Sequence, residues 1–161
     1  MPVIKMVGPE SYPMAKLVAK TCFLSGFFVQ SFCLDSASYV KFDKTPLLSR
    51  QIEFPDILVV TTDSAEDAKD AMKHSKEKSI IILNSKEKPK FPEIKKRRLH
   101  VYNVNANEIS QNILRKQMPH LPLLGALAKS YDKITLRAAK QAAGENKDNS
   151  SAIEEGFKNT K

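Results

Sequence analysis

The stretch Glu53-Phe-Pro-Asp-Ile-Leu-Val-Val-Thr-Thr-Asp63 decides the fold class, because it contains a buried strand and leads directly into a helix. Ile57 to Val60 is an unbroken apolar run rich in β-branched residues, typical of a strand covered on both faces in a parallel sheet. Ser64 is a helix-capping residue type, and Asp67 follows at the spacing of a capping box. Ser79 to Asn84 is a second apolar strand. Strand, helix and strand within about thirty residues predict a right-handed βαβ unit.

Strands and helices are expected to alternate along the rest of the chain. The pattern predicts strands at Val3–Val7, Phe27–Phe32 and Leu99–Val104, with a short edge strand at Tyr39–Phe42. It predicts a loop at Glu10–Pro13 and helices at Met14–Ser25, Ser64 to about Lys76, Asn105 or Asn107 to Lys116, Leu123–Lys129, Thr135–Ala143, and Ser150 or Ser151 to Phe157. The expected fold is α/β, a Rossmann-like three-layer sandwich with a mostly parallel sheet and helices on both faces.

Length and composition indicate one ordinary globular domain. A chain of 161 residues is long enough to bury a core, and its hydrophobic (42%) and charged (27%) fractions are typical of such domains. We expect residues 1–143 to form the domain and residues 144–161 to form a flexible connection and a C-terminal helix packed on it. No apolar run approaches the ~20 residues that span a bilayer, and no signal-peptide pattern is seen, so a cytoplasmic location without membrane contact is expected.

The two cysteines limit the redox groups that this chain can hold. Cys22 and Cys33 do not form a Cys-x-x-Cys pair, so the chain cannot supply four thiolates to an iron–sulfur cluster or zinc ion. Cys22 is expected to pack on a helix face as a small apolar residue.

The net charge of +8 is concentrated in residues 86–98, here called the basic segment. Its prolines, Pro89 and Pro92, favour a loop over a helix. One interpretation is a solvated loop, and the other is an electrostatic contact with an acidic subunit or a phosphate-bearing ligand. No RNA- or DNA-binding motif accompanies it, so nucleic acid is the weaker option. The predicted partner contacts are Lys95, Lys96, Arg97 and Arg98.

Ligands of open parallel sheets bind beyond the carboxyl ends of the strands, which here are Gly8, Thr62-Asp63, Asn84-Ser85 and Asn105. A dinucleotide-binding protein has a glycine-rich turn at the first of these ends. This chain has Gly8-Pro9-Glu10-Ser11-Tyr12-Pro13, in which the prolines remove N–H donors and Glu10 repels phosphate. The sequence argues against a Rossmann cofactor site of the usual kind. The candidate ligand contacts are Gly8, Ser11, Asn84 and Ser85.

Catalytic patterns are missing from the sequence. His74, His100 and His120 have no paired nucleophile or carboxylate nearby in sequence, and no P-loop, Gly-x-Ser-x-Gly or metal-ligand pattern is present. The chain is therefore expected to contain no catalytic residue, metal or cofactor of its own.

Several segments, in order, resemble the gamma subunit of 2-oxoacid:ferredoxin oxidoreductases, which are thiamine-diphosphate enzymes acting on pyruvate, 2-oxoglutarate or branched 2-oxoacids. These segments are Leu17–Phe32 with its Gly-Phe-Phe-Val-Gln-Ser-Phe end, Ser49–Val60 with its Pro-Asp, Ile80–Ser85, Val101–Ala106, Leu123–Lys129 and Ala152–Phe157. Gly8 corresponds to the only retained glycine of the family's Gly-x-Gly-Gly-Gln-Gly turn, Cys33–Val40 replaces a longer loop, and His120 stands where Asn is frequent.

The resemblance implies a non-redox gamma-type subunit of a complex that oxidatively decarboxylates a 2-oxoacid, with pyruvate favoured, to an acyl-CoA. Such a subunit would help to shape the active-site or coenzyme A cleft and to assemble alpha-, beta- and delta-type subunits. Thiamine diphosphate, Mg, iron–sulfur clusters and coenzyme A are then expected in those partners, and ferredoxin as the acceptor. Gly8 and Gly125 carry over as backbone positions, in a turn and a close helix packing. The alternative is a diverged non-catalytic binding or assembly module that has lost the ligand loops.

Overall fold

The computed structural model describes residues 1–49, 51–52 and 54–161, so Arg50 and Glu53, including the first residue of the stretch quoted above, lie outside the described residues. The strands are β1 (Val3–Val7), β2 (Phe28–Leu34), β3 (Ala37–Asp43), β4 (Ile57–Val60), β5 (Ile80–Asn84) and β6 (His100–Val104). The helices are α1 (Ser11–Leu24), α2 (Ala65–Lys73), α3 (Pro92–Lys96), α4 (Ala106–Leu114), α5 (His120–Ser130), α6 (Leu136–Ala142) and α7 (Lys147–Asn159). In this described part of the chain, none of the helices has the length and hydrophobicity needed to span a bilayer.

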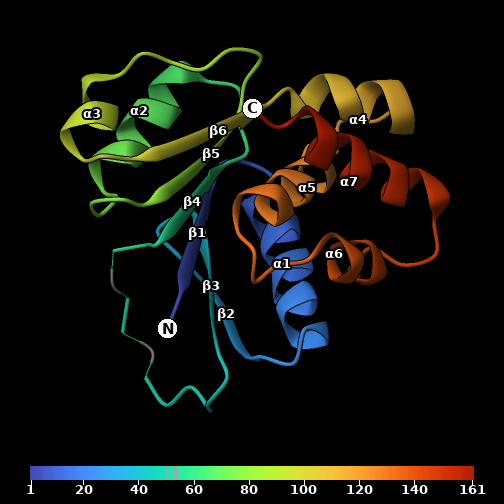
Figure 1. Cartoon of the computed structure of the whole chain (residues 1–161), viewed down its shortest axis with the longest axis horizontal. Coiled ribbons are helices and arrows are strands. Elements are labelled where there is room, and N and C mark those ends of the chain that lie inside the picture. The colour runs from blue at the N-terminus through green and yellow to red at the C-terminus, as the bar shows by residue number, and fades with distance from the viewer. Residues whose placement is uncertain (50, 53) are drawn as a thin grey trace.

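The strands form one six-stranded sheet in the order β2-β3-β1-β4-β5-β6 (Figure 1). β1, β4, β5 and β6 are parallel, whereas β3 is antiparallel to both of its neighbours, β1 and β2. Helices lie on both faces of this sheet (Figure 1). The prediction of an α/β three-layer sandwich with a mostly parallel sheet is confirmed.

The βαβ unit that the sequence predicted lies in the middle of the sheet. All four residues of β4 are buried, and β4 pairs in parallel with β5. The hydroxyl of Ser64 accepts a hydrogen bond from the backbone N–H of Asp67, so the predicted cap of α2 is also confirmed. A strand that is apolar on both faces belongs in the interior because each face is covered by helices.

The prediction that Tyr39–Phe42 is an edge strand is wrong. β3 lies between β2 and β1, and β2 occupies the edge. Asp35 and Ser36 explain the difference, since both have positive φ and form a two-residue hairpin turn between Leu34 and Ala37. The hairpin forces β3 antiparallel to β2 and inserts it beside β1, where a simple doubly wound order would have placed β2.

Several element boundaries also differ from the predictions, and three of these differences have a clear physical reason. α1 begins at Ser11 and includes Pro13, since the first helical turn tolerates a residue without N–H. The basic segment contains the short helix α3, with Pro92 in its first turn, instead of loop alone. α7 begins at Lys147, because the side chain of Asn146 caps it, and not at Ser150 or Ser151.

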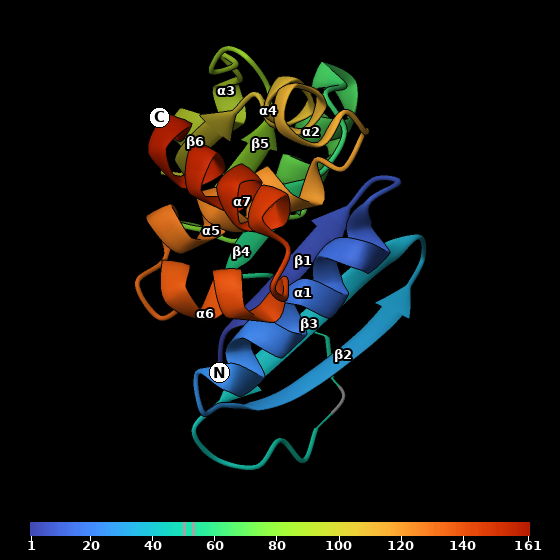
Figure 2. The ribbon, with the colours of Figure 1, turned by 90° about the vertical axis from the view of Figure 1, so that its right-hand side faces the viewer.

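One face of the sheet is covered by α1 and α4–α7, and α2 and α3 cover part of the other (Figures 1 and 2). α5 and α7 pack especially closely. A Cβ added to Gly125 would lie 2.0 Å from the carbonyl oxygen of Ile153, and one added to Gly156 would lie 2.1 Å from that of Pro122. Only glycine at both positions allows the two helix backbones to approach this closely, so the packing role predicted for Gly125 is confirmed.

The face opposite α1 has no helix over β1 and β3 in the described part of the chain. Polar side chains instead hold the segment after β3 against it. Lys41 is fully buried, and its ammonium donates to the carbonyl oxygens of Ser49 (3.2 Å) and Gln51 (2.5 Å). Gln30 donates to the carbonyl oxygen of Leu47 (2.9 Å). These bonds explain how a lysine can occupy the interior of a sheet, since burial of an ammonium requires hydrogen-bond acceptors.

The two cysteines differ in environment. Cys22 on α1 is fully buried, as predicted, and desolvation raises the pKa of its thiol to about 12. Cys33 on β2 is exposed and lies 3.4 Å from the hydroxyl of Ser38.

Candidate functional site

The turn after β1 is tied to the end of β4. The hydroxyl of Thr61 donates to the carbonyl of Val7 (2.9 Å) and accepts from the backbone N–H of Glu10 (3.3 Å). Gly8, with φ of +103°, lies against the same hydroxyl, and a Cβ there would be 2.4 Å from it. Thr61 and Gly8 therefore fix the start of α1, and the turn role predicted for Gly8 is confirmed.

This turn is poorly suited to binding a diphosphate. Pro9 and Pro13 have no N–H, the N–H of Glu10 is bonded to Thr61, and that of Ser11 is bonded to the carbonyl of Gly8. A phosphate site at a helix N-terminus needs such donors to point outward. The glycine-poor turn consequently serves to hold β1, β4 and α1 together.

Asn84, at the end of β5, is the centre of a buried hydrogen-bond network. Its side-chain NH₂ donates to the carbonyl of Thr61 (2.8 Å) and to Oδ1 of Asn107 (3.0 Å). Its own Oδ1 accepts from the backbone N–H groups of Ala106 (3.0 Å) and Asn107 (3.4 Å). Asn107 extends the network by donating to Asp63 (3.4 Å). Asn84 thus joins β4, β5 and the N-terminus of α4, and its polar atoms are directed into the chain.

A carboxylate–imidazole pair lies at the N-termini of α1 and α5. Nδ1 of His120 is 2.8 Å from Oε2 of Glu10, and the His120 side chain is nearly buried while that of Glu10 is partly exposed. Desolvation is the main influence and lowers the pKa of His120, whereas the hydrogen bond to Glu10 and its charge oppose this shift. The two residues are 110 positions apart. Sequence reasoning considered each one separately and missed the pair.

The predicted ligand contacts fall in different places. Gly8 lines a hollow of about 530 Å³, together with Lys5, Thr62 and His74. Asn84 and Ser85 line a small hollow of about 100 Å³ beside Ser64 at the start of α2, and Thr62 borders both hollows. Ser11 is the buried first residue of α1, and its hydroxyl accepts from that of Ser38 on β3 (3.4 Å). The structure thus brings Gly8, Asn84 and Ser85 together at the carboxyl ends of the parallel strands and directs Ser11 inward.

Ser85 and the basic segment are more accessible. The hydroxyl of Ser85 donates to the carbonyl of Glu87 (2.8 Å) within the loop. Lys95, Lys96 and Arg98 are exposed, but Arg97 donates through its guanidinium to the carbonyl of Ser75 and so attaches α3 to the loop after α2. Three of the four predicted partner contacts can therefore reach a partner, and Arg97 has a structural role.

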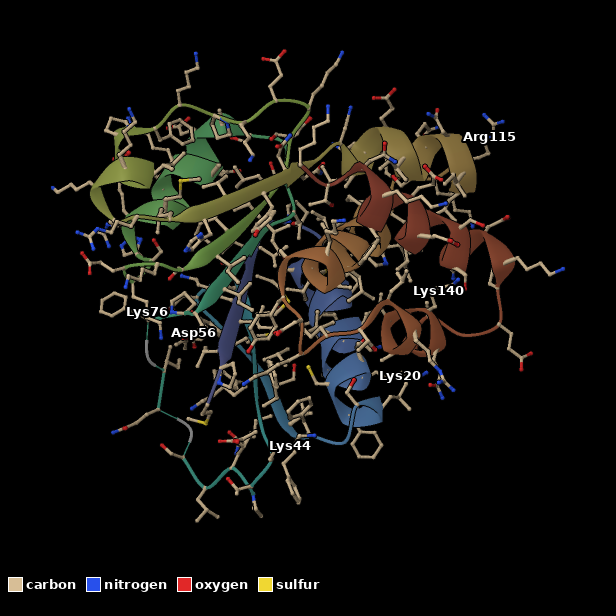
Figure 3. The ribbon with its side chains drawn as sticks, in the orientation of Figure 1. Lys20, Lys44, Asp56, Lys76, Arg115 and Lys140 are labelled. Carbon is tan, nitrogen blue, oxygen red and sulfur yellow. The ribbon has the colours of Figure 1, made fainter. Side chains whose placement is uncertain are left out.

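Positive charge is also distributed beyond the basic segment. Figure 3 shows Lys20 on α1, Lys44 after the end of β3 and Arg115 after the end of α4, whereas Lys76 lies beside Asp56. Lys76 and Asp56 form an ion pair, and Lys140 forms another with Glu154 (3.4 Å). Positive side chains thus occur on several parts of the surface, with their densest run at residues 86–98.

The residues at the carboxyl ends of the parallel strands, here called the carboxyl edge, form a framework held together by hydrogen bonds. Within residues 1–49, 51–52 and 54–161, no three His, Cys, Asp or Glu side chains are grouped so that they could hold a metal ion. The Glu10–His120 pair can move a proton between its members, but no hydroxyl or thiol nucleophile is bonded to it in this part of the chain.

The chain belongs to the pyruvate ferredoxin/flavodoxin oxidoreductase family, whose sequence profile matches residues 34–159. Within that family it is similar to subunits named gamma. It is 28% identical to the pyruvate/ketoisovalerate oxidoreductases common subunit gamma of Thermococcus litoralis, over 95% of this chain and 92% of that protein. It is 26% identical to the subunit of the same name from Pyrococcus furiosus, over 84% of this chain and 79% of that protein.

Solved structures share the fold. The pyruvate oxidoreductase subunit PORC of Thermotoga maritima superposes with a TM-score of 0.79 at 18% identity, covering 99% of this chain and 97% of that one. The 2-oxoglutarate:ferredoxin oxidoreductase of Magnetococcus marinus, solved with 2-oxoglutarate, coenzyme A and succinyl-CoA bound, superposes with a TM-score of 0.73 at 16% identity. It covers 98% of this chain but only 30% of that one, so the same fold forms part of a longer chain there.

Proposed function

We propose that this protein is the non-redox gamma-type subunit of a multi-subunit 2-oxoacid:ferredoxin oxidoreductase. The complex would oxidatively decarboxylate a 2-oxoacid, with pyruvate as the favoured substrate, to an acyl-CoA and pass the electrons to ferredoxin. Membership of the family carries the proposal. The likeness in fold to the PORC subunit further supports a subunit role.

The chain would act by shaping a wall of the active-site or coenzyme A cleft and by holding other subunits. Asn84 and Thr61 make the carboxyl edge rigid, and this edge is where ligands of open α/β sheets bind. Thiamine diphosphate, Mg and iron–sulfur clusters are assigned to alpha-, beta- and delta-type partners, because two separated cysteines and the carboxyl-edge residues do not provide their ligands. The engaged donors of the Gly8 turn do not fit the phosphates of coenzyme A either.

A native pull-down on this chain tests the proposal. Thiamine diphosphate, iron and acid-labile sulfide should be recovered with the chain in fixed ratio, and the preparation should reduce ferredoxin with pyruvate and coenzyme A. Activity with a different 2-oxoacid would correct the substrate and leave the assembly role in place. Recovery of the chain alone, or an active complex that lacks it, would refute membership of the complex.

A second candidate function is that of a diverged binding or assembly module that no longer faces the cleft. The N–H groups of Glu10 and Ser11 are bonded within the chain, which favours this function, since the family's glycine-rich turn is absent. Exposed Lys95 and Lys96 on α3 would then supply the docking surface for an acidic partner.

Charge reversal distinguishes the two candidate functions. Lys95→Glu with Lys96→Glu should weaken partner capture, and added salt should weaken capture by the unchanged chain. Lys16→Glu with Lys20→Glu on α1 is a control with the same change in net charge. Equal capture by both double variants would show that α3 is simply solvated.

A further inference from the structure

The two edge strands of the sheet, β6 and β2, differ in whether their outer backbone groups are hydrogen-bonded. At one edge, Asn103 of β6 exchanges two backbone hydrogen bonds with Lys161, of 3.0 and 3.1 Å. At the other edge, β2 pairs with β3 along its whole length, and in the described part of the chain its backbone makes no hydrogen bond on the outer side. Figure 2 shows β2 as the outermost strand, extending beyond α1. β2 is seven residues long, and alternate residues along it therefore present an outward-facing backbone N–H and C=O.

The residues of β2 do not protect this edge. Exposed edge strands are usually blocked by lysine, proline, a bulge or an inward-pointing charge. β2 reads Phe28-Val-Gln-Ser-Phe-Cys-Leu34 and contains no charge and no proline, in a chain of which 27% is charged. Phe28 and Leu34, at its two ends, are 51% and 45% exposed. A long, uncharged and apolar edge of this kind is suited to pairing with another strand.

The side chains of β2 divide cleanly between the two faces. Val29, Ser31 and Cys33 pair with Phe42, Val40 and Ser38, on the face that α1 covers. Phe28, Gln30, Phe32 and Leu34 lie on the opposite face, where Phe32 stacks on Tyr39 with ring centroids 5.4 Å apart. The exposed apolar residues at both ends of β2 therefore lie on the same face.

We propose that β2 pairs antiparallel with β2 of a second copy of this chain, about a two-fold axis at Ser31. In that register Phe28 lies opposite Leu34 of the other copy, Val29 opposite Cys33, and Gln30 opposite Phe32. The two residues of each pair lie on the same face of the sheet, and the large exposed side chains of β2, Phe28 and Leu34, cover each other. The result is one continuous twelve-stranded sheet, twice the six strands of the single chain.

The backbone permits this register in either hydrogen-bonding phase. If the N–H and C=O of Ser31 point outward, the two Ser31 residues form a hydrogen-bonded pair on the axis. If they point inward, Gln30 and Phe32 form the hydrogen-bonded pairs on either side of the axis. A two-fold axis through one residue satisfies the ladder in both cases.

The pattern of the strand identifies a second copy as the partner. A two-fold contact uses the same surface on both chains, so a strand that pairs with itself must be complementary to its own reverse. β2 meets this condition at its two outer positions, where Phe28 lies opposite Leu34 and Val29 opposite Cys33, and no charge faces another along the strand. The proposal rests on β2 alone and is independent of the proposed enzymatic complex.

Ser31→Lys tests the pairing, because it places two ammonium groups opposite each other on the axis. The unchanged chain should sediment as a dimer of twice its 18.1 kDa over a concentration series. The variant should raise the dimer dissociation constant by about tenfold or more. Ser151→Lys on the exposed side of α7 adds the same charge away from β2 and should leave the dimer intact. A monomeric unchanged chain, or equal effects of both variants, would overturn the proposal.

Disulfide trapping tests the register itself. In a Cys33→Ser background, Ser31→Cys should form a covalent dimer under mild oxidation, since directly opposite Cβ atoms lie about 5 Å apart. Thr45→Cys in the same background is an exposed control outside β2. Circular dichroism of each variant confirms folding. If the control crosslinks to the same extent, the assigned axis is contradicted. It is also contradicted if Ser31→Cys is folded but does not crosslink. Capture of a different subunit through β2 by a monomeric chain would also contradict it.

Discussion

The sheet has two halves that are stabilised in different ways. In the parallel half, β4, β5 and β6 lie between α2 and α3 on one face and the α4–α5–α7 layer on the other. In the hairpin half, β2 and β3 have α1 on one face. On their other face, in the described part of the chain, backbone carbonyls are held by Lys41 and Gln30.

This contrast indicates how each half responds to change. The parallel half depends on close packing, so added volume should be severely destabilising. On the face opposite α1, the hairpin half depends on a few hydrogen bonds to an extended segment. Loss of these bonds should loosen that segment locally and leave the global fold in place.

Gly125→Ala should have the largest effect on the parallel half. The new methyl group would occupy the space of the Ile153 carbonyl, so α5 and α7 must separate, at a cost of about 3 kcal/mol. Gly144→Ala is the matched control, because no atom of the described residues lies within 4 Å of its added Cβ and its positive φ alone opposes the change, by about 1 kcal/mol. Denaturant unfolding of both variants gives the two free energies. Equal losses would mean that the helix contact is not a critical one.

Asn84→Ala should destabilise the carboxyl edge of the same half by about 2 kcal/mol. It removes four hydrogen bonds and leaves the carbonyl of Thr61 and the N–H of Ala106 buried without their partner. Ser85→Ala, next in sequence, removes one loop bond and should cost less than about 0.5 kcal/mol. Thermal unfolding of both variants measures the difference. If both lose the same stability, Asn84 is better explained as a ligand residue than as a structural one.

Lys41→Met should separate local from global stability in the hairpin half. Methionine fills a similar volume, so the global free energy of unfolding should change by less than about 1 kcal/mol. The carbonyls of Ser49 and Gln51 lose their donor, and cleavage after the exposed Leu48 should become faster. Limited proteolysis followed by mass spectrometry measures the rate. An unchanged rate, or a global loss as large as that of Gly125→Ala, would remove the distinction between the halves.

The pair Glu10–His120 should give a small pH dependence to the contact between α1 and α5. The folded pKa of His120 lies below its ordinary value of 6.5, so the folded state binds fewer protons than the unfolded state near that pH. Stability should therefore fall as the pH is lowered from 7 through 6.5 and towards the folded pKa. His120→Gln should flatten this dependence in denaturant midpoints measured between pH 7 and 5.5. A steeper fall in the variant would reverse the assigned sign.

The parallel half was predictable because its signals are local. The run Ile57–Val60 is apolar on both faces, Ser64 caps the helix that follows, and Ser79–Asn84 repeats the pattern. The hairpin half was mispredicted because Asp35-Ser36 lacks the glycine typical of a two-residue turn, yet both residues adopt positive φ. Lys41 compounded the error, since an interior lysine is recognisable only once its acceptor carbonyls are known.

The candidate site was predictable in position but not in detail. Gly8, Asn84 and Ser85 do lie at the carboxyl edge, because strand ends in a parallel sheet converge there. Whether an amide such as Asn84 faces a ligand or the protein depends on Thr61 and Asn107, each 23 residues away in sequence. The contact of Glu10 with His120 likewise depends on how α5 returns to α1, which no local pattern specifies.

The unequal burial of the two cysteines provides a single site for attaching a fluorescent dye. With its pKa near 12, the thiol of Cys22 stays protonated and out of reach of maleimide at neutral pH, whereas Cys33 is accessible on the outermost strand. A single environment-sensitive dye can therefore be attached to the native chain at Cys33 without removing the other cysteine. Its emission would follow, in real time, whatever covers that strand.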